Sequence, residues 1–259
     1  MDTLEGQIAL VTGSNRGLGE AFVDRLVERG AAKVYAAARD IDTLAPLIAR
    51  HNDVLVPVSV DVTEEADIVA AAEHCSDVTL LISNAGVTCI KPILSEPTIG
   101  AFRRVMETNY FGPLMLFRSF APVLKHNGGG AFLQVLSMAA LMTAQVAPAY
   151  SASKAACNML THAMRNELAE NGTRVAMSYP GFFKTRMSDG FEVPMPTPAT
   201  LAGNTLDQFL AGKTAIFPDT FAKMVKQSML DDMSVTLDDP TRVVNELVGA
   251  FVQHPQAGQ

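Results

Sequence analysis

The sequence has little that would suit it to a metal, a disulfide framework or a nucleic acid. Its three cysteines, Cys75, Cys89 and Cys157, are widely spaced and odd in number, which predicts reduced thiols and neither disulfides nor a zinc site. The five histidines show no metal-ligand spacing. Twenty lysines and arginines stand against 27 aspartates and glutamates, so the net charge is −7, and no basic cluster is present that could bind a row of phosphates.

Long apolar runs and linkers are also missing. No run reaches about 18 apolar residues, so no membrane span is predicted. The N-terminus lacks the basic and apolar regions of a signal peptide, and we expect a cytoplasmic protein. The chain has no linker, repeat or low-complexity tract, and its 259 residues are 48% hydrophobic, enough for a full core. We therefore expect one domain over residues 1–259.

Six short apolar runs alternate with helical patterns along the chain. They lie at about 7–12, 33–38, 54–60, 78–83, 131–136 and 173–178. This alternation predicts an α/β fold, a doubly wound parallel sheet with helices on both faces. Pro57 lies inside the third run, and proline is tolerated in sheets mainly on edge strands. The third strand should therefore be an edge of the sheet.

A glycine-rich loop directly follows the first predicted strand, with Gly13, Gly17 and Gly19. Glycine permits a positive φ in a tight turn and lets the backbone approach a pyrophosphate closely. A helix from about Leu18 to Arg29 follows, and its N-terminus offers unpaired N–H groups and the positive end of a dipole. The order of strand, loop and helix predicts a site for the phosphates of a dinucleotide.

Tyr150 and Lys154 stand four residues apart in a stretch with a helical pattern, so their side chains share one face. A nearby positive charge favours the phenolate and suits a tyrosine to acid–base work, although the same spacing also arises by chance on amphipathic helices. Here a strand-like run ends at Ser137, where parallel sheets present functional groups. A hydroxyl, a phenol and an ammonium are therefore expected at one site, and no metal is needed.

Over about residues 5–187 the chain carries a set of motifs that resembles the short-chain dehydrogenase/reductase (SDR) family. In chain order they are the glycine loop from Thr12 to Gly19, Asn84-Ala85-Gly86, Asn109, Ser137, Tyr150-x-x-x-Lys154 and Pro180-Gly181. The resemblance implies a Rossmann-like sheet with strand order 3-2-1-4-5-6. It also implies an oxidoreductase that moves a hydride between a nicotinamide and a carbonyl or alcohol carbon.

The resemblance assigns roles to individual residues. Tyr150 is the acid/base and Ser137 orients the substrate oxygen. Lys154 favours the phenolate and holds the nicotinamide ribose, while Asn109 maintains a helix distortion and a water relay. The implied cofactor contacts are Gly13, Asn15, Arg16, Gly17, Leu18, Gly19, Arg39, Asp61, Val62, Asn84, Ala85, Gly86, Tyr150, Lys154, Pro180, Gly181 and Thr185.

Two of these residues have an equally good structural interpretation. Asp61 stands just before Glu64 and Glu65, where it could cap a helix instead of, or as well as, contacting the adenine. Asn109 could be a buried side chain that satisfies backbone groups, and the helix distortion would then have the same geometry.

NADP(H) is the expected cofactor because of the end of the second strand. An NAD enzyme of this fold usually has a carboxylate there for the ribose 2′-hydroxyl, whereas this chain has Ala38 followed by Arg39. Arg16 and Arg39 could together bind a 2′-phosphate with charge-assisted hydrogen bonds. Asp40 is the counter-argument, since it could accept from the ribose, but capping a helix near Ile41 is its favoured role. NAD(H) stays possible.

Two other functions are open. The same residues can serve epimerisation or dehydration, in which the nicotinamide is oxidised and reduced within one turnover, and net cofactor consumption separates these cases. A dinucleotide-sensing regulator of this fold would have no need of Ser137, Tyr150 and Lys154 together.

The substrate side departs most from the family pattern. An uncharged, fairly apolar ketone or alcohol is favoured because the residues expected to line the pocket are mostly apolar. They are Ala139, Ala140, Leu141, Val146, Phe182, Phe183 and Met187. Residues 187–212 show little periodicity and are predicted to be a mobile lid.

The C-terminal part lacks the family's final strand with its Asp-Gly-Gly-like turn. Residues 214–219 are the best candidate for a seventh strand, and Asp239 could begin a terminal helix. Family members of this kind pair through helices around 98–124 and 150–170, so a homodimer or homotetramer is expected. Apolar residues on these helices look exposed, although core packing explains some of them equally well: Met115, Phe117, Met159 and Leu160.

Overall fold

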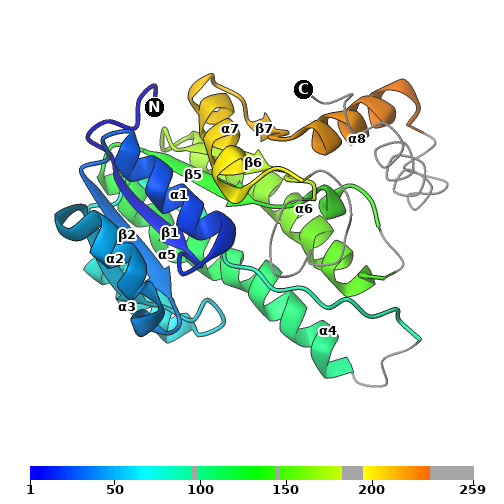
Figure 1. Cartoon of the computed structure of the whole chain (residues 1–259), viewed down its shortest axis with the longest axis horizontal. Coiled ribbons are helices and arrows are strands. Elements are labelled where there is room, and N and C mark those ends of the chain that lie inside the picture. Colours follow the sequence, from blue (N-terminus) through cyan, green and yellow to red (C-terminus); the bar gives the residue numbers. More distant parts are fainter. Residues whose placement is uncertain (95–98, 144–145, 183–194, 234–259) are drawn as a thin grey trace.

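A computed structural model describes residues 1–94, 99–143, 146–182 and 195–233, in which one parallel sheet forms the centre (Figure 1). Its strands are β1 (Ile8–Thr12), β2 (Lys33–Ala38), β3 (Leu55–Ser59), β4 (Leu80–Ser83), β5 (Ala131–Val135), β6 (Arg174–Ser178) and β7 (Ala215–Ile216). They are ordered β3-β2-β1-β4-β5-β6-β7, with every pair parallel. The predicted Rossmann-like order is confirmed, β3 with Pro57 is an edge, and the predicted seventh strand forms the other edge.

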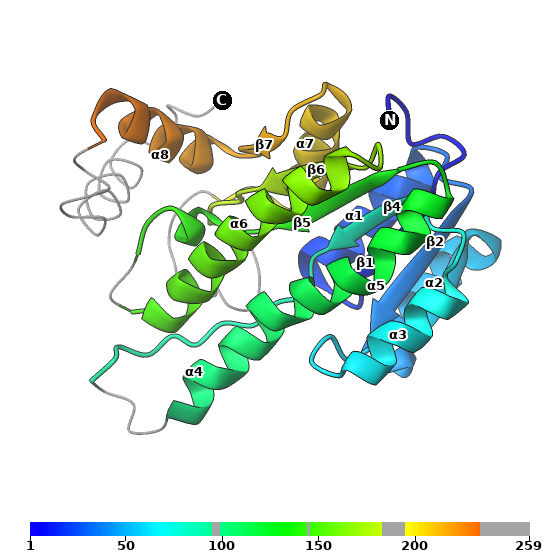
Figure 2. The same ribbon diagram turned by 180° about the vertical axis from the view of Figure 1, so that it is seen from behind.

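Helices cover both faces of the sheet. They are α1 (Gly17–Glu28), α2 (Ala45–His51), α3 (Glu65–His74), α4 (Ile99–Met106), α5 (Gly112–His126), α6 (Pro148–Ala169), α7 (Pro198–Leu210) and α8 (Thr220–Asp231). One buried apolar cluster joins the sheet to α1, α2 and α7, and a second joins it to α3, α5 and α6. Figures 1 and 2 show these two layers from opposite sides.

The strands are apolar on both faces because both faces are covered. In β1, Ala9 and Val11 belong to the cluster under α1, whereas Leu10 points to the cluster on the other side. Side chains alternate along a strand, so a strand buried on two faces has a continuous apolar sequence. Burial of each large apolar side chain contributes about 1.5–3 kcal/mol to folding. The apolar runs in the sequence therefore mark the central strands well.

The helix after the glycine loop begins at one glycine and is followed closely by another. Helix α1 begins at Gly17. Two residues after its end, Gly30 has a φ of +80°, a left-handed conformation that glycine adopts without strain. The predicted range of about 18–29 and the predicted stop at Gly30 are confirmed.

The prediction of a lid over residues 187–212 is wrong for its second half. Residues 198–210 form α7, capped by the Thr197 hydroxyl, which accepts a hydrogen bond from the Thr200 N–H at 3.2 Å. Leu206 and Phe209 are fully buried in the cluster that also contains α1. Apolar residues at helical spacing fix this helix, although neighbouring prolines and glycines obscured the pattern. Residues 187–194 and the predicted terminal helix from Asp239 lie outside the described residues.

The described residues offer neither a membrane-spanning helix nor a cluster of metal ligands. In these parts of the chain, no helix is both long enough and apolar enough to cross a membrane. The same residues contain no group of three or more histidine, cysteine, aspartate or glutamate side chains that could hold a metal ion. The three cysteines are free, and burial raises the pKa of the Cys75 thiol to about 12.

Candidate active site

The loop between β1 and α1 has the backbone shape that its glycines predicted. Gly13 and Gly17 have φ values of +68° and +62°. A Cβ atom at Gly19 would lie 2.1 Å from the carbonyl oxygen of Gly13, so a side chain there would displace the loop. A Cβ at Gly17 would meet nothing within 4 Å, and this side of the loop is open. The loop and the N-terminus of α1 therefore form a cradle that fits the phosphates of a dinucleotide.

Asn84 and Thr12 connect this loop to the end of β4. The Thr12 hydroxyl oxygen accepts hydrogen bonds from the N–H groups of Asn84 and Ala85, both at 3.0 Å. The Asn84 side-chain amide donates to the Thr12 carbonyl at 2.9 Å. Asn84 was predicted from its motif, whereas the structural role of Thr12 was not. Together they hold the loops after β1 and β4 side by side at the carboxyl ends of these neighbouring strands.

Asn109 lies in a distorted helical turn, as predicted. Residues Glu107–Phe111 form a π-helical turn between α4 and α5, and the Asn109 side chain is buried. Its Oδ1 accepts from the Val87 N–H at 2.9 Å, and its Nδ2 donates to the Val87 carbonyl at 2.8 Å. The same amide donates to the Ser153 hydroxyl at 2.9 Å, which in turn donates to the Tyr150 carbonyl at 2.8 Å. This path fixes the helical turn that carries Tyr150.

Lys154 is 3% exposed and lies one helical turn after Tyr150 in α6. Its Nζ is 5.8 Å from the centroid of the Tyr150 ring and donates to the Val135 carbonyl at 3.0 Å. A Cβ at Gly86 would lie 3.6 Å from this Nζ and 3.3 Å from the Asn109 Oδ1. The loop after β4 thus passes close to both side chains, and the three predicted motifs at Gly86, Asn109 and Lys154 meet.

Ser153 and Gln134 belong to this neighbourhood although the sequence analysis did not select them. Gln134 donates from Nε2 to the Ser83 and Val135 carbonyls at 3.2 and 3.3 Å, so it shares the Val135 acceptor with Lys154. Its Oε1 is a buried side-chain oxygen without a hydrogen-bond partner within the described ranges. A polar residue inside an otherwise apolar strand was the signal in the sequence.

Ser137 lies just beyond β5 and begins the short 3₁₀ helix Met138–Ala140. Its hydroxyl oxygen accepts a hydrogen bond from the Ala139 N–H at 3.2 Å. This bond uses a lone pair, so the hydroxyl proton can still be donated to a substrate oxygen. The Met138 N–H donates to the Pro180 carbonyl at 3.0 Å, which joins the Ser137 loop to the turn after β6.

Gly181 in that turn is in contact with a buried carboxylate that sequence reasoning missed. The Gly181 N–H donates to the Asp219 Oδ2 at 2.8 Å. Asp219 is 6% exposed, and burial raises the pKa of its carboxyl group while bonds from the Gly181 and Ala222 N–H groups oppose the shift. The signal in the sequence was an aspartate in N-cap position after the seventh strand.

The residues near the end of the second strand that bear on the cofactor differ in what they contact. Arg16 and Arg39 are exposed at the two loop ends. Asp40 caps the short helix Ile41–Leu44, since its Oδ1 accepts from the Asp42 N–H at 3.1 Å, which confirms the favoured alternative for this residue.

Asp61 is not the N-cap of α3, so that interpretation is wrong. Helix α3 is entered from Glu64, and the Asp61 Oδ1 instead accepts from the Thr63 N–H at 3.0 Å in the preceding turn. The turn places Val62 against α5, where a Cβ at Gly112 would lie 3.0 Å from the Val62 carbonyl oxygen. Thr185 lies outside the described residues.

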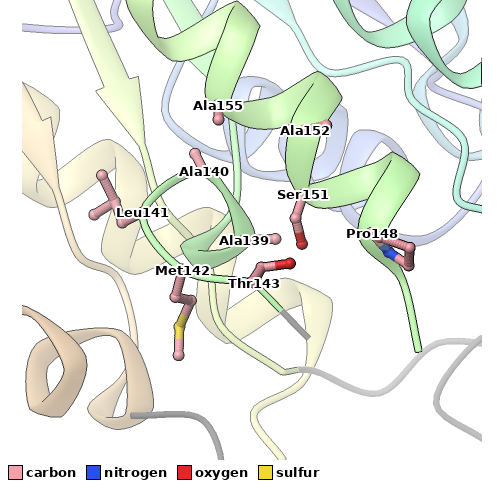
Figure 3. Close-up of a pocket in the computed structure, with 9 residues that line it drawn as sticks. All are labelled: Ala139, Ala140, Leu141, Met142, Thr143, Pro148, Ser151, Ala152 and Ala155. Atoms are coloured by element: carbon pink, nitrogen blue, oxygen red, sulfur yellow. The ribbon is translucent and has the colours of Figure 1, made fainter. Parts of the chain in front are cut away.

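A cavity of about 310 Å³ lies between the loop after Ser137 and the first turns of α6 (Figure 3). Most of its lining is apolar, and the hydroxyl oxygens of Thr143 and Ser151 point toward it. Its lining residues are Ala139, Ala140, Leu141, Met142, Thr143, Pro148, Ser151, Ala152 and Ala155. Three of the predicted pocket residues are among them. Val146 and Phe182 are 53% and 42% exposed, and Phe183 and Met187 lie outside the described residues.

Two solved structures are similar to this chain in both sequence and fold. A solved short-chain dehydrogenase from Burkholderia cenocepacia, in complex with NADP, is 36% identical with a TM-score of 0.85, over 90% of this chain and 96% of that one. A gluconate 5-dehydrogenase from Burkholderia cenocepacia, in complex with NADP and tartrate, is 28% identical with a TM-score of 0.68, over 72% of this chain and 75% of that one.

A curated relative and a family model agree with these structures. A 3-alpha-(or 20-beta)-hydroxysteroid dehydrogenase of Mycobacterium tuberculosis is 30% identical over 190 residues, 72% of this chain and 72% of the relative. The model of the short chain dehydrogenase family matches residues 7–193. The chain therefore belongs to the short-chain dehydrogenase/reductase family of oxidoreductases.

Proposed function

We propose that the protein is an NADP(H)-dependent oxidoreductase that interconverts a carbonyl and an alcohol, with Tyr150 as the acid/base. The observation that carries the proposal is the arrangement behind Tyr150. Lys154 is buried with its ammonium 5.8 Å from the phenol ring, and the hydrogen-bonded path from Asn109 through Ser153 reaches the Tyr150 backbone. An exposed lysine at a chance Tyr-x-x-x-Lys spacing would have no such support.

The chemistry follows from what each side chain can donate. In the reducing direction Tyr150 gives its phenol proton to the substrate oxygen, and the Ser137 hydroxyl donates a hydrogen bond to the same oxygen. The positive charge of Lys154 stabilises the phenolate that is left. The nicotinamide, when bound, supplies or accepts the hydride at the substrate carbon.

Asn109 supports reprotonation of Tyr150 from solvent. The π-helical turn Glu107–Phe111 replaces the regular hydrogen bonding of an α-helix at this point, which leaves a backbone carbonyl available to a water. Lys154 has three N–H donors, and the Val135 carbonyl accepts from one of them. A water between the turn and Lys154 would carry a proton from solvent toward Tyr150.

NADP(H) preference is supported at the end of β2. Ala38 ends this strand where an NAD enzyme usually has a carboxylate, and the Asp40 carboxylate is occupied as a helix cap. Arg39 and Arg16 are both exposed and free to approach a 2′-phosphate by charge-assisted hydrogen bonds. Both solved relatives from Burkholderia cenocepacia are complexes with NADP.

An uncharged and fairly apolar substrate is supported by the cavity between the loop after Ser137 and the first turns of α6, whose lining includes Ala139 and Ser151 but neither Ser137 nor Tyr150. The lining combines alanine, leucine and methionine side chains with two hydroxyl groups. Such a surface can bury an apolar body and fix one or two polar groups, as a hydroxysteroid would offer, whereas a sugar acid would leave charge and hydroxyl groups unpaired.

Exposed apolar residues support a homodimer or homotetramer. Met159 on α6 is 70% exposed, whereas Met115, Phe117 and Leu160 pack partly against the core and give less support. Light scattering at micromolar concentration would test the assembly, and a monomer would contradict it.

A panel of carbonyl compounds tests the reaction itself. Consumption of NADPH is followed by absorbance for apolar ketones, hydroxysteroid ketones and sugar acids, with NADH in parallel. We expect stoichiometric oxidation of NADPH with an apolar ketone. Product formation without net NADPH consumption would indicate epimerisation or dehydration instead.

A further inference from the structure

The last strand and helix of the described chain contact the turn that follows β6. The Tyr179 N–H donates to the Ile216 carbonyl at 2.8 Å, and the Tyr179 ring stacks on Phe217 with centroids 5.2 Å apart. Three residues after Tyr179, the ring of Phe182 lies 5.1 Å from the ring of Phe221, measured between centroids. The turn that carries Pro180 and Gly181 is thus held from the side of β7 and α8.

Asp219 makes the central contact of this set. Its Oδ2 accepts from the Gly181 N–H and its Oδ1 accepts from the Ala222 N–H, each at 2.8 Å. The second bond caps α8, and the first reaches a residue 38 positions earlier in the chain. The two oxygens of one carboxylate therefore connect α8 to the Pro180–Gly181 turn.

Capping alone does not account for a buried aspartate. Thr197 caps α7 with an exposed hydroxyl, and serine and asparagine cap helices as well as aspartate does. Burying a carboxylate is costly, and burial raises the pKa of Asp219, whose facing charged group is Lys223. The bond to Gly181 is what an ionised carboxylate adds to a simple cap.

Gly181 has no room for any other arrangement. A Cβ at this position would lie 2.7 Å from the Asp219 Oδ1 and 2.9 Å from the Phe221 ring. The Gly181 backbone therefore packs against the Asp219 carboxylate with no space for a side chain. The neighbouring Pro180 carbonyl accepts from the Met138 N–H, next to Ser137. A chain of contacts therefore runs from α8 through the turn to the backbone of Met138, the residue after Ser137.

We propose that Asp219 is a positioning residue that holds the Pro180–Gly181 turn against the Ser137 loop, and so sets the alignment of substrate oxygen with Tyr150. This inference rests on the proposed function. It predicts a loss in kcat with little change in NADPH affinity, because the glycine loop and Arg39, which follow β1 and β2, would hold the phosphate end of the cofactor.

Two substitutions separate positioning from capping. Asp219→Ser keeps an oxygen that can cap α8 but is too short to reach Gly181 as well. Asp219→Asn keeps the shape of the side chain, but its amide NH₂ would face either the Gly181 or the Ala222 N–H, so that a donor would replace an acceptor. We expect each variant to lower kcat about tenfold or more, the loss of one charged hydrogen bond, and to change the Kd for NADPH less than about threefold. Thr197→Ala, which removes the exposed cap of α7, should lower Tm and leave kcat unchanged.

A second readout does not depend on turnover. Amide hydrogen exchange at residues 179–182 should be faster in Asp219→Ser than in the parent, because the Gly181 N–H has lost its acceptor. Faster exchange together with reduced kcat in Asp219→Ser supports the proposal even where Asp219→Asn fails to fold.

Parental kcat or unchanged exchange in Asp219→Ser would overturn it and leave the proposed function standing. A parent protein that neither binds nor oxidises NADPH would overturn the proposed function and this inference together.

Discussion

The two ends of the cofactor cleft are built in different ways. After β1 the loop depends on backbone shape, with positive φ at Gly13 and Gly17 and a close approach at Gly19. After β6 the turn depends on side chains from a distant element, Asp219 and the stacked pair Tyr179 and Phe217. The first device presents N–H groups to any phosphate, whereas the second determines how one particular turn meets the Ser137 loop. Because the two devices lie in different loops, substitutions can test binding and alignment separately.

The largest expected effect lies between the two ends. Tyr150→Phe removes the proton donor and keeps the ring, so kcat should fall about a hundredfold to ten-thousandfold with NADPH affinity nearly intact. Steady-state kinetics with the best ketone and a fluorescence titration with NADPH measure the two quantities. Leu160→Met on the same helix, partly buried and away from the phenol, is the control. Near-parental turnover of Tyr150→Phe would show that another group transfers the proton.

A substitution in the glycine loop should break binding and not alignment. The added methyl of Gly19→Ala would lie 2.1 Å from the Gly13 carbonyl oxygen. Overpacking of this kind costs about 1–3 kcal/mol, which would correspond to a Kd for NADPH weaker by about fivefold to 150-fold. Gly203→Ala in α7 is the matched control, because its Cβ would first meet the Arg25 Nε at 3.7 Å, an ordinary contact. Equal NADPH affinity in both variants would refute the role of the close approach.

The phosphate-binding end can be tested further through Arg39. At about 1.5–3 kcal/mol for a hydrogen bond to a charged group, Arg39→Ala should weaken NADPH binding about tenfold or more and change NADH binding little. Arg50→Ala removes the same charge from an exposed cluster with Glu20 and Asp24 and is the control. A parent that binds NADH more tightly, or an Arg39 variant that loses both cofactors equally, would contradict NADP(H) preference.

The same contrast explains what the sequence could predict. The glycine loop, the strands and the cap at Asp40 depend on residues close together in the chain, so the sequence alone predicts each of them. Pro57 identified the β3 edge because a missing N–H has a direct consequence for pairing. The overall order of the sheet, by comparison, came from the family resemblance.

Long-range contacts explain what was missed. Gly181 and Asp219 are 38 residues apart, and Asn109 and Ser153 are 44 apart, so no local pattern connects them. Helix α7 was missed for a different reason. Its first residue is Pro198, and proline, which is favoured in the first turn of a helix, also interrupts the apolar pattern from which a helix is predicted.

The smallest expected effect is on stability, and it distinguishes the side-chain end from the glycine end. Burial raises the pKa of Asp219 above its ordinary value of 3.8, with Lys223 opposing, so the folded protein holds this proton to a higher pH than the unfolded chain. The stability contributed by the protonated form is therefore complete below the ordinary value and is lost as pH rises through the raised pKa. Asp219→Asn cannot ionise and should not show this loss, and the raised pKa of the parent already includes the Gly181 and Ala222 hydrogen bonds that favour its ionised form. The free energy of unfolding of the variant relative to the parent should therefore increase between about pH 4 and about pH 7.

Urea unfolding at both pH values, with unchanged m-values, measures the difference, and all other ionisable groups are common to the two proteins and cancel. A difference that stays constant or shrinks as pH rises would mean that Asp219 carries no ionisation cost in the fold, and a simple helix cap would then account for it.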